Sequence, residues 1–182
     1  MTAAVLQRFE GRVALVTGAA SGVGRAVAVQ LAGEGAQVFG VDLDEKGLEE
    51  TARLCGDGRF HAIARDLREA SACREVVAEA TRHAGGLDAL CNVAGINRFH
   101  NFLEMSEADW HAILAVNLSS VAFLCQAALP GLIERRGCIV NVASVAASRG
   151  QAYTVAYCAS KGGVVQLTRA ISSGCAIFRG PE

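Results

Sequence analysis

The sequence is poor in proline and in aromatic residues, and it carries almost no net charge. Of 182 residues only 2 are proline and 5% are aromatic, whereas 20 are glycine. The 17 basic and 18 acidic side chains leave a formal net charge of -1, which argues against a surface for nucleic acid or an anionic membrane. With 52% hydrophobic and 19% charged residues, the composition excludes intrinsic disorder and predicts a compact fold with a buried core.

Long apolar runs and paired cysteines are also missing. No continuous run approaches the ~20 apolar residues of a membrane span, and residues 1–11 lack the apolar core of a secretory signal. We therefore expect a cytoplasmic protein with no membrane partner. The 7 cysteines form no C-x-x-C pair and the 4 histidines share no ligand spacing, so reduced cysteines and no metal site are predicted.

Short apolar runs alternate with helix-like segments along the whole chain. Strands are predicted over 12–17, 37–42, 60–64, 87–92 and 138–143, and helices over 23–33, 45–54, 69–83, 106–135 and 155–170. This alternation predicts right-handed crossovers and an α/β fold, a Rossmann-type doubly wound parallel sheet in three α/β/α layers. No linker or repeat divides the chain, so residues 1–182 are expected to form a single domain.

A glycine-rich turn stands between the first predicted strand and the first predicted helix. It reads TGAASGVG over residues 17–24, a G-x-x-x-G-x-G spacing. Glycine lets a backbone turn tightly and approach a pyrophosphate, whose charge is met by N–H groups at the helix N-terminus. Because glycine clusters also occur in ordinary turns, the strand–turn–helix context is what favours a dinucleotide site. The residues expected to contact it are Gly18, Ser21, Gly22, Val23 and Gly24.

The carboxylate that ends the second predicted strand indicates which dinucleotide would bind. Asp42 could accept hydrogen bonds from ribose hydroxyls and would repel a 2′-phosphate. Leu43 follows it, and no Arg or Lys occupies positions 19–23. These features favour NAD over NADP. Asp42 could instead only cap the following turn, although Asp44 is the better candidate for the cap of the next helix.

Two residues near the start of the last predicted helix suggest proton transfer. Tyr157 and Lys161 are four residues apart and so share one helix face. A phenol ordinarily ionises at about pH 10, and a neighbouring ammonium favours the phenolate, which eases proton exchange with an alcohol or carbonyl. The pattern alone is common on surfaces. Ser144 could steady a substrate oxygen or simply start a loop, and Asn117 could be an ordinary surface or packing residue.

Together these features resemble the short-chain dehydrogenase/reductase family in their order and spacing. The resemblance covers residues 10–170 and rests on the glycine turn, Asp42, the NVAG sequence at 92–95, Asn117, Ser144, Tyr157 and Lys161. Val93 replaces the second Asn of the family's NNAG motif, which is a mild departure. The family implies an NAD-dependent oxidoreductase that interconverts a secondary alcohol and a ketone by hydride transfer.

The resemblance also assigns roles to single residues. Tyr157 would be the general acid/base and Lys161 its partner and a ribose ligand, while Ser144 would orient the substrate and Asn117 would support a proton relay. Further cofactor contacts are implied for Leu43, Asp66, Leu67, Asn92, Ala94, Gly95 and Tyr157 itself, although Asp66 read alone would be a turn or capping residue. The substrate pocket would be rimmed by Asn97, His100, Gln151 and Tyr153. Family members commonly assemble through the long helix and the Tyr-bearing helix, which implies a homo-oligomer, a dimer or a tetramer.

The family pattern breaks after Ala170. Residues 171–182 contain Ser-Ser-Gly and Gly-Pro, which read as helix breakers, and their composition matches no family segment. We therefore expect a C-terminally truncated member, or one with an aberrant tail, that lacks the family's last strands and exposes the edge of the fifth strand. Because hydride transfer tolerates little misplacement, turnover should be weak or absent. The alternative function is a non-catalytic protein for dinucleotide binding or oligomer interaction.

Overall fold

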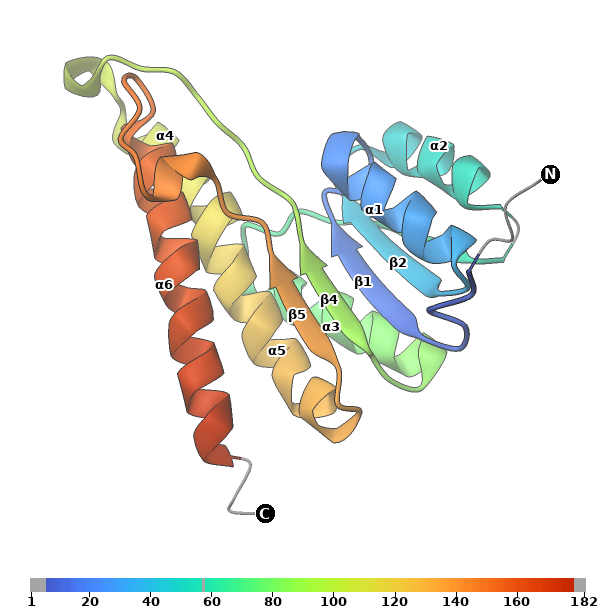
Figure 1. The fold of residues 1–182 in the computed structure, drawn as a ribbon. Coiled ribbons are helices and arrows are strands. Elements are labelled where there is room, and N and C mark those ends of the chain that lie inside the picture. Colours follow the sequence, from blue (N-terminus) through green and yellow to red (C-terminus); the bar gives the residue numbers. More distant parts are fainter. Residues whose placement is uncertain (1–5, 57, 179–182) are drawn as a thin grey trace.

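Five parallel strands form the centre of the molecule in the computed structural model, which describes residues 6–56 and 58–178 (Figure 1). The strands are β1 (Val13–Thr17), β2 (Gln37–Asp42), β3 (Phe60–Ala64), β4 (Ala89–Asn92) and β5 (Cys138–Asn141). Their order is β3-β2-β1-β4-β5, and every neighbouring pair is parallel. The predicted doubly wound sheet is thereby confirmed, with its order reversing between β1 and β4.

Helices cover both faces of the sheet. On one face lie α1 (Gly22–Gly33) and α2 (Glu45–Cys55), and on the other lie α3 (Ala70–Ala84) and α5 (Ser120–Glu134), with α6 (Val155–Phe178) beyond them at the β5 side (Figure 1). The short elements are η1 (Phe102–Glu104), α4 (Glu107–Leu114), the π-helical turn η2 (Ala115–Ser119) and η3 (Val145–Ala147). The predicted three layers are therefore present.

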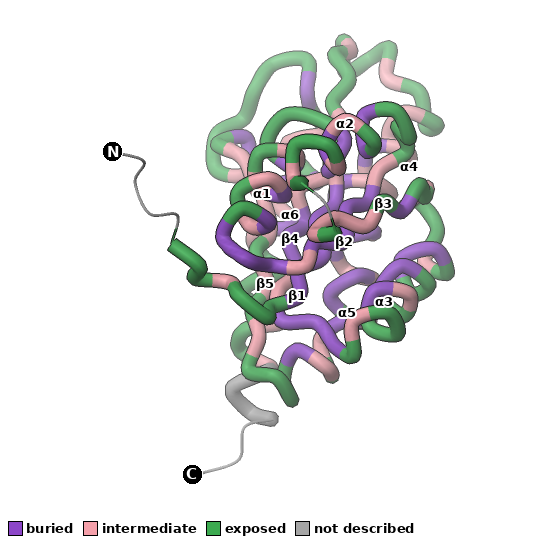
Figure 2. Tube along the Cα trace, turned by 90° about the vertical axis from the view of Figure 1, so that its right-hand side faces the viewer, coloured by how far each residue is buried: buried purple, intermediate pink, exposed green. Residues whose placement is uncertain are grey.

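The core follows the two-residue period of the strands. Val13 and Leu15 pack with α3 and α5, whereas Val16 packs with α1 and α2. All residues of β1 are buried, and the tube view shows the middle of the sheet as mostly purple (Figure 2). A strand buried on both faces reads as a continuous apolar run, which is why β1 could be recognised from its sequence.

Two helices begin at a capping side chain, and for Asp44 this was predicted from the sequence. The Asp44 carboxylate accepts from the Gly47 N–H at 3.1 Å and caps α2. The Ser106 hydroxyl accepts from the Asp109 N–H at 3.1 Å, so Ser106 caps α4. In both places a side-chain oxygen satisfies an N–H that has no partner within the helix.

The predicted end of the last helix is wrong. Helix α6 runs to Phe178, through the Ser-Ser-Gly sequence that was expected to stop it at Ala170. Serine and glycine lower helix propensity by about 1 kcal/mol or less each, and only proline also removes a hydrogen bond of the helix. The remaining predicted tail, 179–182, lies outside the described residues. Strands β4 and β5 are shorter than predicted, by two residues each.

One helical stretch is apolar on average although it holds no long continuous apolar run. The helical stretch Glu107–Glu134 is long and apolar enough to cross a membrane by length and composition alone. Scattered Ser, Asn and Gln residues interrupt its apolar run, so a search for continuous runs passes over it. In this fold its buried residues Leu124 and Cys125 belong to the core beneath the sheet, as in the core helix of a soluble protein.

The outer edge of β5 has no strand beside it within residues 6–56 and 58–178. Val140 is 53% exposed and Cys138 is exposed, in keeping with the predicted bare edge. Next to this edge a cavity of about 320 Å³ opens between α5, β5 and α6, and Ile139 and Ile171 are among its lining residues. An unpaired apolar edge of this kind is a template for pairing with another chain.

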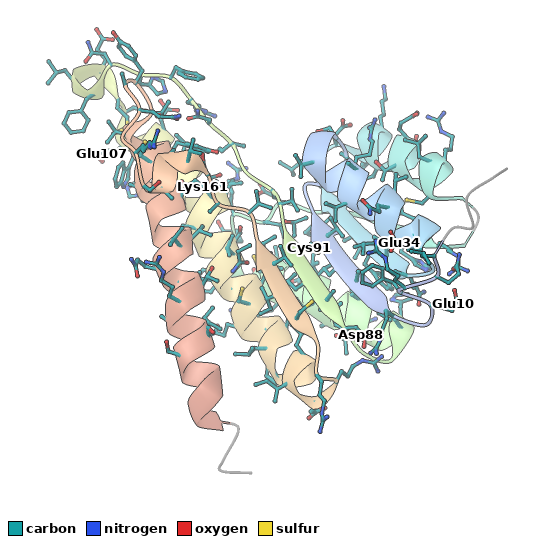
Figure 3. All side chains as sticks on the ribbon, in the orientation of Figure 1. Glu10, Glu34, Asp88, Cys91, Glu107 and Lys161 are labelled. Atoms are coloured by element: carbon teal, nitrogen blue, oxygen red, sulfur yellow. The ribbon has the colours of Figure 1, made fainter. Side chains whose placement is uncertain are left out.

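Asp88 ties together the amino-terminal ends of the central strands (Figure 3). Its buried carboxylate accepts from the Val13 N–H at 2.9 Å, from Arg12 at 3.0 Å and from Arg135 at 2.9 Å. Burial alone would raise the pKa of Asp88, but the hydrogen bonds from Arg135, Val13 and Arg12 outweigh it and lower the pKa. The carboxylate therefore stabilises the fold only while it is ionised.

We expect Asp88→Asn to lower the free energy of unfolding at pH 7 by about 2 kcal/mol, because the amide leaves buried donors unsatisfied. Since the folded-state pKa lies below the ordinary value of 3.8, the wild-type advantage is complete above pH 3.8 and disappears as pH falls through the folded-state pKa. Urea unfolding at several pH values measures this difference. The exposed Glu49→Gln serves as control, and a difference that stays constant into the acid range would contradict the assignment.

Candidate dinucleotide and catalytic site

A cavity of about 420 Å³ lies at the carboxyl ends of the strands, where the strand order reverses. Open α/β sheets bind ligands at this place. Among its lining residues are eleven of the predicted cofactor contacts: Gly18, Ser21, Gly22, Val23, Gly24, Asp42, Leu43, Asp66, Leu67, Ala94 and Gly95. The structure therefore brings together, around one hollow, residues from the turns that follow β1, β2, β3 and β4.

Two glycines of the first turn are required by close backbone contacts. A Cβ atom on Gly18 would lie 2.9 Å from Ala94 Cα, and the residue has a φ of +69°. A Cβ atom on Gly24 would lie 2.0 Å from the Gly18 carbonyl oxygen. Only glycine therefore fits at these two positions, and the turn can keep this tight shape, which the close approach of a pyrophosphate needs.

Thr17 joins the two central turns and was not singled out from the sequence. Its hydroxyl, on a side chain that is almost fully buried, accepts from the Val93 N–H at 3.0 Å and from the Ala94 N–H at 3.1 Å. The available signal was a polar residue at the end of an otherwise apolar strand. Its function is to hold the turn after β4 against the turn after β1.

The Asp42 carboxylate is fixed at the edge of the cavity by backbone donors. Its Oδ2 accepts from the Ala20 N–H at 3.1 Å, and its Oδ1 accepts from the N–H groups of Leu43 at 2.7 Å and Asp44 at 3.2 Å. The turn-capping alternative is thus partly realised, while Asp44 caps α2 as expected. An ionised carboxylate has about four acceptor positions, so capacity remains for ribose hydroxyls.

Charged residues also surround the far end of the cavity. Asp66 is held by Arg68, whose Nε donates to its Oδ2 at 2.8 Å, and these side-chain hydrogen bonds lower the pKa of Asp66. Arg65 lines the cavity too, and its guanidinium lies 3.7 Å from Glu75 and 4.0 Å from Glu79. The sequence pattern indicates Asp66 but neither arginine, because the argument about a nearby cation concerned only positions 19–23 of the glycine turn.

Asn92 is the predicted cofactor residue whose side chain points elsewhere. Its Nδ2 donates to Asn141 Oδ1 at 2.8 Å and lies 3.5 Å from Cys125 Sγ, on the side of the sheet that packs against α5. Asn92 does not line the cavity. Alternation along a strand explains the result, because a side chain and the turn that follows it need not share a face.

Asn117 connects the cavity to the helix that carries Tyr157. It is fully buried in the π-helical turn η2, and its Oδ1 accepts from the Ile96 N–H at 2.8 Å. Its Nδ2 donates to the Ile96 carbonyl at 2.9 Å and to Ser160 Oγ at 3.1 Å. The Ser160 hydroxyl in turn donates to the Tyr157 carbonyl at 2.7 Å. The alternative of a surface residue is excluded, and Asn117 instead links two segments of the site.

Lys161 lies near the start of α6, where Figure 3 labels it, beside the predicted acid/base. Its Nζ is 5.8 Å from the centre of the Tyr157 ring and donates to the Val142 carbonyl at 2.7 Å. A Cβ atom on Gly95 would lie 3.5 Å from the same Nζ, which places the ammonium next to the cavity wall. Burial lowers the pKa of Lys161.

Ser144 and the predicted rim loops occupy the same end of the sheet. The Ser144 hydroxyl accepts from the Ala146 N–H at 3.2 Å and caps η3, so the loop-starting alternative describes at least one of its contacts. The His100 N–H donates to the Tyr153 carbonyl at 2.9 Å, which brings the two predicted rim loops together. Tyr153 has a φ of +64°, a conformation that costs energy for a residue other than glycine.

The family model described as short chain dehydrogenase matches residues 12–177 of this chain. The chain belongs to this family. The match extends beyond Ala170, so the expected boundary of the family-like region was too early, in agreement with the continuation of α6 to Phe178.

Individual relatives support the same assignment. D-threitol dehydrogenase of Mycolicibacterium smegmatis is 41% identical over 169 residues, covering 91% of this chain and 65% of the relative. Meso-2,3-butanediol dehydrogenase of Serratia marcescens is 37% identical over 165 residues, with 91% and 66% covered. A short-chain dehydrogenase/reductase structure from Brucella melitensis gives a TM-score of 0.88 at 41% identity, with 92% and 71% covered. The chain thus spans about two thirds of the length of these relatives.

We expect Lys161→Met to raise the free energy of unfolding at pH 7, because an apolar side chain replaces a buried ammonium. The folded-state pKa lies below 10.5, so the unfolded chain binds more protons between these two values. The free energy of unfolding of the wild-type chain should therefore rise relative to that of the variant as pH rises through that range. Urea unfolding from pH 7 to 10 measures the difference, with Lys46→Met, at the only other lysine, as control. A variant less stable at pH 7 would refute this expectation.

Proposed function

We propose that this chain binds NAD(H) in the 420 Å³ cavity and carries the proton-transfer residues of an oxidoreductase that interconverts a secondary alcohol and a ketone. One observation supports this most strongly. The Asn117 amide bonds to Ile96 at the cavity and to Ser160 on the helix of Tyr157 and Lys161. Cofactor cavity and acid/base pair are therefore parts of one site.

The residues present fit a dinucleotide. The glycines at 18 and 24 allow the tight turn that a pyrophosphate approaches, and the helix N-terminus of α1 favours negative charge there. Asp42 would receive the ribose hydroxyls, and its charge disfavours a 2′-phosphate, so NAD is favoured over NADP. When bound, the nicotinamide supplies hydride transfer.

The chain's own residues would handle the proton. The Tyr157 hydroxyl would take the proton of an alcohol, or give one to a carbonyl, while Lys161 stabilises the phenolate by its charge. Ser144 would orient the substrate oxygen. Asn117 acts as a positioning residue, because it holds the turn of Tyr157 relative to Ile96 through Ser160.

The relatives that act on hydroxyl compounds support this reaction class, since D-threitol and 2,3-butanediol are both secondary alcohols. A small-molecule alcohol or ketone is accordingly the proposed substrate. Assembly into a homo-oligomer and a cytoplasmic location belong to the same proposal, and the first of them follows from the family resemblance.

A second candidate is a non-catalytic dinucleotide-binding or interaction protein. It is favoured by the β5 edge, which no strand covers within residues 6–56 and 58–178, and by the 320 Å³ cavity beside it. Hydride transfer requires the ring at a near-attack distance, so dinucleotide affinity could persist where turnover is weak.

Titration of the purified chain with NADH and NADPH tests the cofactor assignment. We expect NADH to bind more tightly than NADPH. Asp42→Asn should reduce the ratio of the two Kd values about tenfold, because it removes the repulsion of the 2′-phosphate and weakens the acceptor for the ribose hydroxyls. Glu45→Gln, which neutralises an exposed carboxylate of the same segment that does not line the cavity, is the matched control. Equal affinity for the two dinucleotides in the unchanged chain would remove the case for NAD.

Assays with a panel of secondary alcohols and ketones separate the two candidates. If the chain turns over, Tyr157→Phe should lower kcat about 100-fold or more and leave NADH affinity within about twofold, because only the proton carrier is lost. Tyr153→Phe is the matched control at the only other tyrosine. NADH binding without any turnover supports the second candidate, and turnover that survives Tyr157→Phe would overturn the assigned acid/base.

A further inference from the structure

Side chains of α1 and α2 form hydrogen bonds to the glycine-rich turn on the side that faces α2. These contacts of Arg25 and Thr51 are called the grip below. The Thr51 hydroxyl of α2, which is fully buried, lies 2.8 Å from the Ala19 carbonyl and 3.0 Å from the Gly47 carbonyl. The Arg25 guanidinium of α1 donates to the Ala20 carbonyl, to Gly47 O at 3.3 Å, and through Nε to Thr51 Oγ1 at 3.0 Å. These two side chains thus bind three backbone carbonyls.

Each grip fixes the direction of one peptide group. In a trans peptide the C=O and the following N–H point to opposite sides, and no peptide bond of the described chain is cis. The Ala19 carbonyl faces Thr51, and the Ala20 N–H of the same peptide donates to Asp42 on the other side. The Ala20 carbonyl faces Arg25, so the N–H of Ser21 points away from Arg25. Ser21 itself lines the 420 Å³ cavity.

Helix α2 lies so close to the turn that there is no room for a side chain at Gly47. A Cβ atom on Gly47 would lie 2.7 Å from Ala20 Cβ and 2.8 Å from the Ala20 carbonyl oxygen. Helix α2 therefore rests directly on the back of the turn. The donors of the half-buried Arg25 and of the buried Thr51 have these acceptors only while the turn keeps its present shape, so the contacts favour that shape.

We propose that Arg25 and Thr51 are positioning residues that aim the backbone N–H groups of the turn, Ser21 above all, at the phosphates of the bound dinucleotide. The inference rests on the proposed dinucleotide function. It assigns part of the phosphate affinity to α2, an element that does not touch the phosphates. Asp42 does not depend on the grip alone, because the N–H groups of Leu43 and Asp44 also hold its carboxylate.

Binding of three ligands tests this inference: NADH, ADP-ribose and adenosine, which lacks phosphates. The informative variants are Thr51→Val, which removes only the hydroxyl, and Arg25→Met. We expect the Kd of NADH and of ADP-ribose to rise about tenfold in both, as expected for one lost charge-assisted interaction. The Kd of adenosine should change less than about threefold, because its contacts at Asp42 remain.

Two further variants serve as controls. Thr51→Ser keeps the hydroxyl and should restore the affinity for NADH to within about threefold of the unchanged chain. Arg53→Met removes an exposed arginine of the same helix, one paired with Glu50 at i,i+3, and should leave all three affinities unchanged.

Amide hydrogen exchange gives a readout that needs no ligand. The Ala20 N–H, which donates to Asp42, should exchange about tenfold faster in Thr51→Val, while the amides of β1 stay protected. If the Ala20 N–H of Thr51→Val exchanged as slowly as in the unchanged chain, the inference would be overturned, whatever the binding assays gave.

The binding outcomes distinguish the inference from the function beneath it. If the unchanged chain binds neither NADH nor ADP-ribose, the proposed function fails and the inference fails with it. If the unchanged chain binds both, and Thr51→Val and Arg25→Met bind them within about twofold of it, only the inference is overturned. A loss of adenosine affinity equal to the loss of ADP-ribose affinity would also overturn it, because it would reveal general damage to the site.

Discussion

One close contact between two turns determines the shape of the site. The turn after β1 meets the turn after β4 at Gly18 and Ala94, with no space for a side chain between them, and the Thr17 hydroxyl bonds the second turn from below. Because the sheet order reverses between these two strands, α1 leaves on one face and the chain after β4 leaves toward the other. The contact closes the floor of the crevice, and the cavity above it is what remains open for a ligand.

Asn117 extends this constraint to the catalytic helix. A buried amide without partners would cost several kcal/mol, yet both of its polar atoms are satisfied by Ile96 and Ser160. The π-helical turn η2 gives the amide this position, because the wider turn changes the direction in which the Asn117 side chain leaves the helix. A displacement of Ile96, and so of the cofactor turn, would be passed on to the turn that bears Tyr157.

The strands, the glycine turn and the Tyr–Lys pair could be predicted because each leaves a pattern in residue types: apolar runs for β1, glycines where backbones touch, and four-residue spacing on a helix. The roles of Thr17, Ser160, Arg25 and Thr51 could not, because these side chains bind backbone N–H and carbonyl groups, which are the same at every position. The end of α6 was misjudged for a related reason. Serine and glycine weaken a helix without ending it. Whether the helix continues depends on the propensity of the whole segment and not on the Ser-Ser-Gly sequence alone.

The two halves of the site depend on different parts of the fold. The proposed phosphate and ribose end is enclosed by β1, β2, α1 and α2, and its backbone donors and acceptors are held by Asp42 and the buried Thr51. The proposed proton-transfer end depends on Lys161, a buried ammonium whose pKa is lowered by burial, and on segments next to β5, whose outer edge is bare within the described residues. Affinity for a dinucleotide accumulates from contacts that the first half already contains. Hydride transfer adds the stricter demand that the second half hold the ring and the substrate at a near-attack distance, where small displacements cost orders of magnitude in rate. Under the proposed function, dinucleotide binding and turnover are therefore separable, and binding would rest on the more completely enclosed half of the structure.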